Sequence, residues 1–209
     1  MTALRSPSLD DHVLGHPHAL AQRRFRARSV AVVGFMGVGK SSVGRELARL
    51  LDRPFVDTDH EVEARSGRTI PQLFAEGEPV FRALERACIV EALDRPPCVI
   101  ALGGGAFSQP GAAELLLERA LVVHLHTSWR ALLPLLPVLA ADRPLIGTRP
   151  TWEVQELFLN RVASYRRAHV RVCLQRTSVE DAAEAVASVL TVDHPHSGEV
   201  GVEDQRRQD

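Results

Sequence analysis

Residues 34–42 read Gly-Phe-Met-Gly-Val-Gly-Lys-Ser-Ser, directly after the apolar run Ser29–Val33. A strand, a glycine-rich turn and a Lys-Ser pair in this order are typical of a phosphate-binding loop. The glycines permit a tight turn whose backbone N–H groups point inward, and the positive end of the next helix adds to the attraction for phosphate. We expect this loop to hold a nucleoside triphosphate, with Gly34, Gly37 and Gly39 shaping the turn. The alternative is a glycine-rich turn that matches by chance.

Two residues of this loop have chemical roles of their own. Lys40 carries a charge that can reach the outer phosphates, and Ser41 has a hydroxyl that can bind Mg²⁺. We therefore expect a nucleoside triphosphate as a co-substrate and Mg²⁺ as the cofactor.

Composition limits the classes of protein to which the chain can belong. Its 209 residues are 45% apolar and carry a net charge of −1, which suits one α/β domain without a general nucleic-acid surface. The three cysteines lack CxxC spacing and suit a reducing compartment. The N-terminal segment lacks the apolar centre of a secretory signal, and no apolar run is long enough to span a bilayer. We expect a cytoplasmic monomer with no nucleic-acid or membrane partner.

Short apolar runs alternate with helical patterns along residues 29–190. The expected strands are Val30–Gly34, Pro54–Asp57, Cys98–Leu102, Leu121–His126 and Val170–Leu174. The expected helices are Lys40–Leu51, Ile70–Phe74, Val80–Leu93, Gly111–Glu118, Trp152–Ala168 and Asp181–Leu190. Such alternation produces a parallel sheet with helices on both faces. The sequence therefore predicts a three-layer α/β/α domain at 29–190 with a five-stranded parallel sheet. Residues 1–28 are expected to form a flexible extension, and 191–209 a disordered tail.

Polar residues gather where the predicted strands end, which is where ligands bind in an open parallel sheet. Asp57 and Asp59 end the second strand and share a side if the segment is extended. One carboxylate could contact Mg²⁺ and the other a substrate hydroxyl; alternatively, an Asp simply caps the next helix. The third strand ends in Gly103-Gly104-Gly105, which allows close approach of a ligand or is only a flexible connection.

Arg82 lies near the start of a predicted helix, in Gly77-Glu-Pro-Val-Phe-Arg-Ala-Leu-Glu85. An arginine at such a place can bind a carboxylate through two hydrogen bonds. The alternative is a surface ion pair between Arg82 and Glu85, which would contribute little to stability.

Together these motifs resemble the shikimate kinase family. GFMGVGKSS, FVDTD, GEPVFRALE, LGGGA and ADRPLI occur in this order and are followed by Arg161-Val-Ala-Ser-Tyr165. The resemblance covers the chain from about Val30 to Leu190 and implies a P-loop fold of the nucleoside-monophosphate-kinase type. It also implies ATP-dependent phosphorylation of the 3-hydroxyl of shikimate, in the synthesis of chorismate and aromatic amino acids.

The resemblance assigns roles to particular residues. It implies that the phosphates of ATP are held by Gly37, Val38, Gly39, Lys40, Ser41 and Ser42. It also implies that Ser41 and Asp57 serve the hydrated Mg²⁺, and that Asp59 binds the substrate hydroxyls and helps to deprotonate the attacking one. Lys40 and Arg143 would stabilise the transferred phosphoryl group, with Arg143 on a lid at about 129–150. The shikimate carboxylate and ring would be bound by Arg82, Arg161, Gly103, Gly104 and Gly105. Arg176 falls near the nucleobase loop of the family.

The lid departs from the family pattern. Residues 131–142 are rich in leucine, and Pro134 and Pro137 break any long helix. This segment is either a lid whose sequence has diverged but which still closes, or an altered lid with weaker catalysis. Two other functions therefore remain open: a binding or sensor domain with reduced turnover, and a kinase for a related polyol acid such as gluconate.

Overall fold

Five parallel strands form most of the sheet, as the sequence predicts. The computed structural model describes residues 13–14, 27–140, 144–174 and 177–191, and these strands follow the spatial order β6-β5-β2-β4-β3. Their bounds are Ser29–Val33 (β2), Phe55–Asp57 (β3), Val99–Ala101 (β4), Ala120–His126 (β5) and Val170–Cys173 (β6). Because β2 lies between β4 and β5, the turn that follows it opens near the middle of the carboxyl edge of the sheet.

A sixth strand extends the sheet beyond the five predicted ones. Strand β1 (Val13–Leu14) pairs antiparallel with β6, with Val13 opposite Val172 and Leu14 opposite Arg171. This pairing lies within the segment 1–28, so two residues of the expected extension belong to the sheet.

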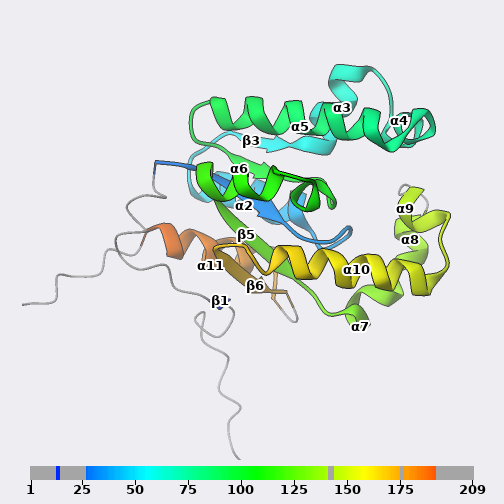
Figure 1. Cartoon of the computed structure of the whole chain (residues 1–209). Coiled ribbons are helices and arrows are strands. Elements are labelled where there is room, and N and C mark those ends of the chain that lie inside the picture. Colours follow the sequence, from blue (N-terminus) through cyan, green and yellow to red (C-terminus); the bar gives the residue numbers. More distant parts are fainter. Residues whose placement is uncertain (1–12, 15–26, 141–143, 175–176, 192–209) are drawn as a thin grey trace, which may run out of the picture.

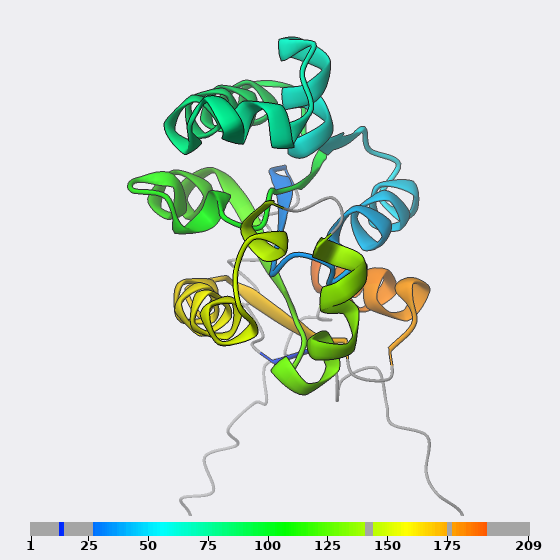
Figure 2. The ribbon, with the colours of Figure 1, turned by 90° about the vertical axis from the view of Figure 1, so that its right-hand side faces the viewer.

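Helices cover both faces of the sheet. The α-helices are α2 (Lys40–Leu50), α3 (Thr58–Ser66), α4 (Ile70–Glu76), α5 (Glu78–Asp94), α6 (Ala112–Arg119), α7 (Trp129–Leu132), α8 (Leu136–Ala140), α9 (Pro144–Gly147), α10 (Thr151–Tyr165) and α11 (Val179–Thr191). Two short 3₁₀ helices are η2 (Ala106–Ser108) and η3 (Leu133–Leu135). The turned view shows α2 and α11 on one side of the sheet and α6 and α10 on the other (Figure 2).

Alternate residues along the central strand enter two separate hydrophobic clusters, because successive side chains of a strand point to opposite faces. Val32 belongs to the cluster that contains Leu47 of α2 and Val186 of α11. Val33 belongs to the cluster that contains Leu116 of α6 and Tyr165 of α10. The two buried faces fix β2 firmly, and with it the start of the turn at Gly34.

Helices α3, α4 and α5 form a unit beside the outer strand β3 (Figure 1). Their own small core contains Val62, Ile70, Leu73, Phe81 and Cys88. The chain therefore places this unit and the turn after β2 at the same end of the sheet, where the two can line a common pocket.

Candidate active site

The predicted phosphate loop has the expected backbone. Gly37 and Gly39 have φ angles of 79° and 87°, which L side chains rarely adopt, and Lys40 begins α2 directly afterwards. No side chain of the described residues caps this helix, so its first N–H groups remain available for an anion. The Lys40 ammonium donates to Phe35 O at 3.0 Å, which folds it back over the loop.

Asp57 is joined to this loop. The Ser41 hydroxyl donates to Asp57 Oδ2 at 2.5 Å, which brings together the two residues expected at the metal. Mg²⁺ in phosphoryl-transfer sites is typically held by one or two protein oxygen ligands and the phosphates, so this pair fits that ion. The described residues contain no group of three or more His, Cys, Asp or Glu that could hold a metal ion by itself.

The two aspartates do not share one side of an extended segment. Asp57 ends β3 and caps α3, and its Oδ1 accepts from the N–H groups of Asp59 and His60 at 3.1 and 3.4 Å. Asp59 already lies in the first turn of this helix, which the sequence analysis missed. The helical turn separates the carboxylates: Asp57 faces Ser41, while Asp59 lines a different pocket.

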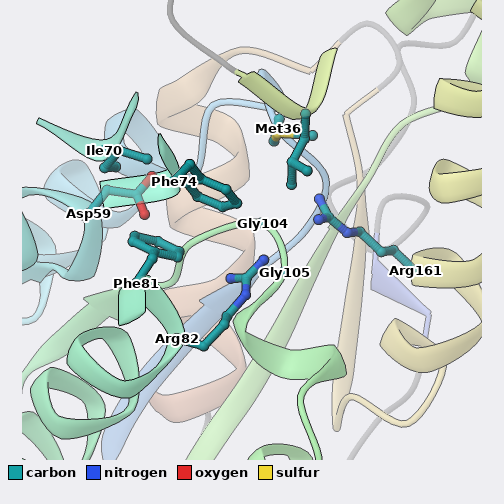
Figure 3. A pocket seen from close by; sticks show the side chains of 10 residues that line it. Met36, Asp59, Ile70, Phe74, Phe81, Arg82, Gly104, Gly105 and Arg161 are labelled. Carbon is teal, nitrogen blue, oxygen red and sulfur yellow. The ribbon is translucent and has the colours of Figure 1, made fainter. Parts of the chain in front are cut away.

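We call that pocket the central pocket (Figure 3). Its lining residues are Met36, Asp59, Ile70, Phe74, Phe81, Arg82, Gly104, Gly105, Leu145 and Arg161. It therefore combines one carboxylate, two guanidinium groups and an apolar wall. Five of the residues predicted for the substrate lie here: Asp59, Arg82, Gly104, Gly105 and Arg161.

The sixth predicted residue, Gly103, lies just behind the central pocket. Its N–H donates to the Thr58 hydroxyl at 2.9 Å. A Cβ at this position would lie 2.7 Å from Asp59 Oδ1 and would also overlap Glu85 Oε1. The glycine is thus required by close packing against two carboxylates rather than by direct lining of the pocket.

Arg82 and Glu85 form a buried ion pair, so the surface-pair alternative is wrong. Glu85 is 1% exposed, and its Oε2 accepts from Arg82 Nη1 at 2.6 Å. Burial raises the pKa of Glu85, although Arg82 opposes this shift. Burial also disfavours the charge of Arg82, but Glu85 and Glu78 outweigh it, and the pKa of Arg82 is raised. Two carboxylates thus hold this guanidinium in place.

Arg161 reaches the pocket from α10, on the opposite wall. It is 5% exposed, and its guanidinium lies over the Phe35 ring at 5.4 Å. Burial lowers its pKa, and its Nη1 has no hydrogen-bond partner among the described residues. A buried cation with an unused N–H donor favours an anionic ligand, because a carboxylate would supply both charge and acceptor.

Tyr165 fixes the glycine triplet from behind. Its hydroxyl contacts Gly104 O and, at 3.2 Å, Gly34 O, and the residue is 1% exposed. It therefore connects the segment after β4 to the end of β2. The sequence analysis had no signal for this role, because a tyrosine one helical turn after Arg161 looks like any packing residue.

The segment that is expected to form the lid contains the short helices α7 to α9, as the prolines predict. Leu132 and Leu136 join the core, and Leu139 packs so closely on the phosphate loop that a Cβ on Gly37 would lie 2.6 Å from its Cδ1. Leu145 lines the central pocket. Two predicted site residues, Arg143 and Arg176, lie outside the described part of the chain.

The apolar wall of the central pocket also escaped the sequence analysis. Ile70 and Phe74 lie four residues apart on α4, and Phe81 precedes Arg82 on α5. Their helical spacing marks a buried face, but it does not distinguish a pocket wall from ordinary core. Along the described residues, no helix has the length and hydropathy required to cross a membrane.

Comparison with known proteins points to one family. The family model described as "Shikimate kinase" matches residues 36–191. A shikimate kinase of Caulobacter vibrioides is 44% identical over 171 residues, which are 81% of this chain and 85% of that protein. One from Geobacillus kaustophilus is 37% identical over 168 residues, covering 79% and 89% of the two chains.

Solved structures show the same similarity. The shikimate kinase of Acinetobacter baumannii, solved in complex with shikimate, matches with a TM-score of 0.73 and 34% identity. The match covers 83% of this chain and 97% of that chain. That of Aquifex aeolicus has a TM-score of 0.69 and 31% identity, covering 78% and 95%. The family model and these relatives cover most of the chain, and the chain belongs to the shikimate kinase family.

Proposed function

We propose that this chain transfers the γ-phosphoryl group of ATP to the 3-hydroxyl of shikimate, giving ADP and shikimate 3-phosphate. The observation that carries the proposal is the central pocket, which combines Asp59, Arg82 and Arg161 beside a phosphate loop. A cyclic acid with several hydroxyl groups needs cations for its carboxylate, an acceptor for its hydroxyls and apolar walls for its ring. The pocket offers all three.

On the acceptor side, Arg82 and Arg161 hold the substrate carboxylate. Arg161 supplies a buried Nη1 without a partner in the described residues, while Arg82 is kept in place by Glu85. Asp59 accepts a hydrogen bond from the attacking hydroxyl and takes its proton as the oxygen bonds to the γ-phosphorus. The bond between that phosphorus and the β,γ-bridging oxygen breaks, and ADP leaves with the electron pair.

On the donor side, the residues from Gly37 to Ser42 bind the phosphates of ATP. Ser41 and Asp57, joined at 2.5 Å, are the residues that would hold Mg²⁺. When bound, this ion neutralises charge on the phosphate oxygens. Lys40 adds charge at the outer phosphates, and we assign Arg143 to the same task and Arg176 to the nucleobase. Positioning and electrostatics supply most of the catalysis in such transfers.

A coupled assay of ADP release tests the substrate. We expect turnover with shikimate and far less with gluconate, because Arg82 and Arg161 lie close together and suit a compact cyclic acid better than an open chain. A Cβ at Gly105 would lie 2.6 Å from Arg82 Nη2 and 3.0 Å from Arg161 Nη2. Turnover with gluconate alone would favour a kinase for another polyol acid. Binding of ATP and shikimate without formation of the 3-phosphate would favour a sensor domain.

The variant Asp59→Asn tests the mechanism. It keeps the size of the side chain but removes the proton acceptor, so we expect turnover nearly to vanish while ATP still binds. Glu61→Gln is the matched control, because Glu61 lies on the same helix but pairs with Arg65 at 3.4 Å. Full activity of Asp59→Asn would exclude Asp59 from proton transfer.

A further inference from the structure

A second cavity lies behind the central pocket, between α5 and the segment from η2 to α6. We call it the rear groove, and its volume is about 250 Å³. Arg82, Glu85, Arg86 and Ile89 line its α5 side, at the spacing of one helix face. Its volume lies just below the lower end of the roughly 300–1,000 Å³ found for ligand pockets, so it suits a small ligand.

The walls of the rear groove are mostly apolar. Ala83 and Ile89 of α5 face Ala106, Ala112 and Leu115 across it. Such a surface favours a flat hydrocarbon ring over a sugar or a free phosphate, because hydroxyl groups here would lose water without gaining partners.

The charged groups of the groove select for an anion. Glu85 is already paired with Arg82, so Arg86 supplies the excess positive charge. Arg86 lies at the exposed rim, and the described residues occupy one of its five N–H donors, through Nη1 to Pro110 O at 3.2 Å. The remaining donors form a fork that matches a carboxylate.

From these observations we infer that the rear groove binds a small ring-bearing carboxylate, with its ring between α5 and α6 and its carboxylate on Arg86. The proposed site consists of Arg86 at the opening of the rear groove and the apolar walls behind it, and it is distinct from the central pocket.

The rear groove and the central pocket share Arg82 as a wall. On the central side, a Cβ at Gly105 would lie 2.6 Å from Arg82 Nη2, so the guanidinium fills the space between the two cavities. Gln109, which also lines the groove, donates to Gly105 O at 3.4 Å. A ligand in the groove therefore lies against Arg82, and its carboxylate on Arg86 adds negative charge near the central pocket. This charge weakens the binding of a carboxylate there, and the effect is reciprocal. This coupling rests on the proposed function; the binding itself does not.

Direct titration tests the binding without any enzyme activity. Phenylacetate is the probe, benzyl alcohol is the uncharged comparison, and binding to the full chain is followed by calorimetry without ATP or shikimate. We expect phenylacetate to bind and Arg86→Ala to weaken it about tenfold or more, since charged hydrogen bonds are lost. Ala83→Leu should block the groove, whereas Arg49→Ala, an exposed arginine on α2, should leave binding unchanged.

Two results would overturn the inference: no binding of phenylacetate, or binding that both Arg86→Ala and Ala83→Leu leave intact. In the coupled assay, phenylacetate should raise KM for shikimate severalfold to a plateau, with KM for ATP unchanged. A rise without a plateau that persists in Arg86→Ala would place the probe in the central pocket and contradict the coupling. Loss of coupling with retained binding would leave the groove as a site but refute its effect on Arg82.

Discussion

The hydroxyl of Tyr165 joins two parts of the site, and its removal has a calculable cost. Tyr165→Phe keeps the ring, which packs 5.0 Å from His124 and 6.3 Å from Phe107, but removes the contacts to Gly104 O and Gly34 O. Leaving buried acceptors without a donor costs about 1–3 kcal/mol. For a domain of this size each kcal/mol shifts Tm by about 2–4 °C, so Tm should fall by roughly 2–12 °C.

The same change should alter substrate binding selectively. With this anchor lost, the Gly103–Gly105 segment is held less firmly in the free chain and shikimate must order it on binding, so KM for shikimate should rise while KM for ATP stays constant. Urea unfolding and steady-state kinetics measure both effects. Ser188→Ala is the control, because it removes a 2.9 Å bond to Ala185 O on the remote helix α11. A Tyr165→Phe variant with unchanged Tm and unchanged KM for shikimate would refute the reasoning.

Three further predictions concern buried ionisable groups. Burial raises the pKa of Tyr165 above its usual 10, so the folded protein should ionise this residue only at higher pH. The chain has a single tyrosine, so ultraviolet absorption can measure this ionisation. The free energy of unfolding should fall as pH rises above 10, because the unfolded chain loses the tyrosine proton more readily. Glu85→Ala should cost about 3–5 kcal/mol in urea unfolding, because it removes the buried carboxylate that is paired with Arg82 and leaves only the exposed one. Glu78→Gln changes that exposed partner and should cost no more than ~1 kcal/mol, so equal losses would contradict this. Burial lowers the pKa of His124 from 6.5 to about 3, so the unfolded chain binds an extra proton between these values. Stability should then fall with pH below 6.5 by about 1.4 kcal/mol per unit, and His124→Phe should remove that part of the slope.

The central part of the fold could be predicted because its signals are local. Strands buried on both faces appear in the sequence as continuous apolar runs, and Val30–Val33 is one of them. The turn from Gly34 to Lys40 needs backbone angles that glycine adopts readily, so it also leaves a mark in the sequence. The position of the site at the strand ends then follows from the rule that ligands bind at the carboxyl edge of a parallel sheet.

Helix α3 could not be predicted because its hydrophobic pattern is weak. Only Thr58 and Val62 are buried among its nine residues, so no apolar stripe marks the helix. The assumption of an extended segment then placed Asp57 and Asp59 on one side. The strand at Val13–Leu14 was missed for a similar reason, since two residues carry no periodic pattern.

The burial of Glu85 depends on contacts between distant parts of the chain. Its carboxylate lies against the segment around Gly103, which follows β4 in the chain, whereas Glu85 lies on the helix before β4. A Glu three residues after an Arg on a helix looks like a solvent-exposed pair unless that contact is known. The sequence therefore indicates which charged residues matter, but not which carboxylate supports them.

The start of α3 acts as a fixed spacer between the two halves of the proposed reaction. In our proposal Asp57 serves the nucleotide side and Asp59 the acceptor side, and a single hydrogen-bonded turn joins the two residues. In the proposed reaction, the main-chain geometry of this turn therefore helps to set the distance between the phosphorus atom and the attacking hydroxyl. An engineered insertion or deletion at this joint would misalign donor and acceptor together, even with every functional group retained.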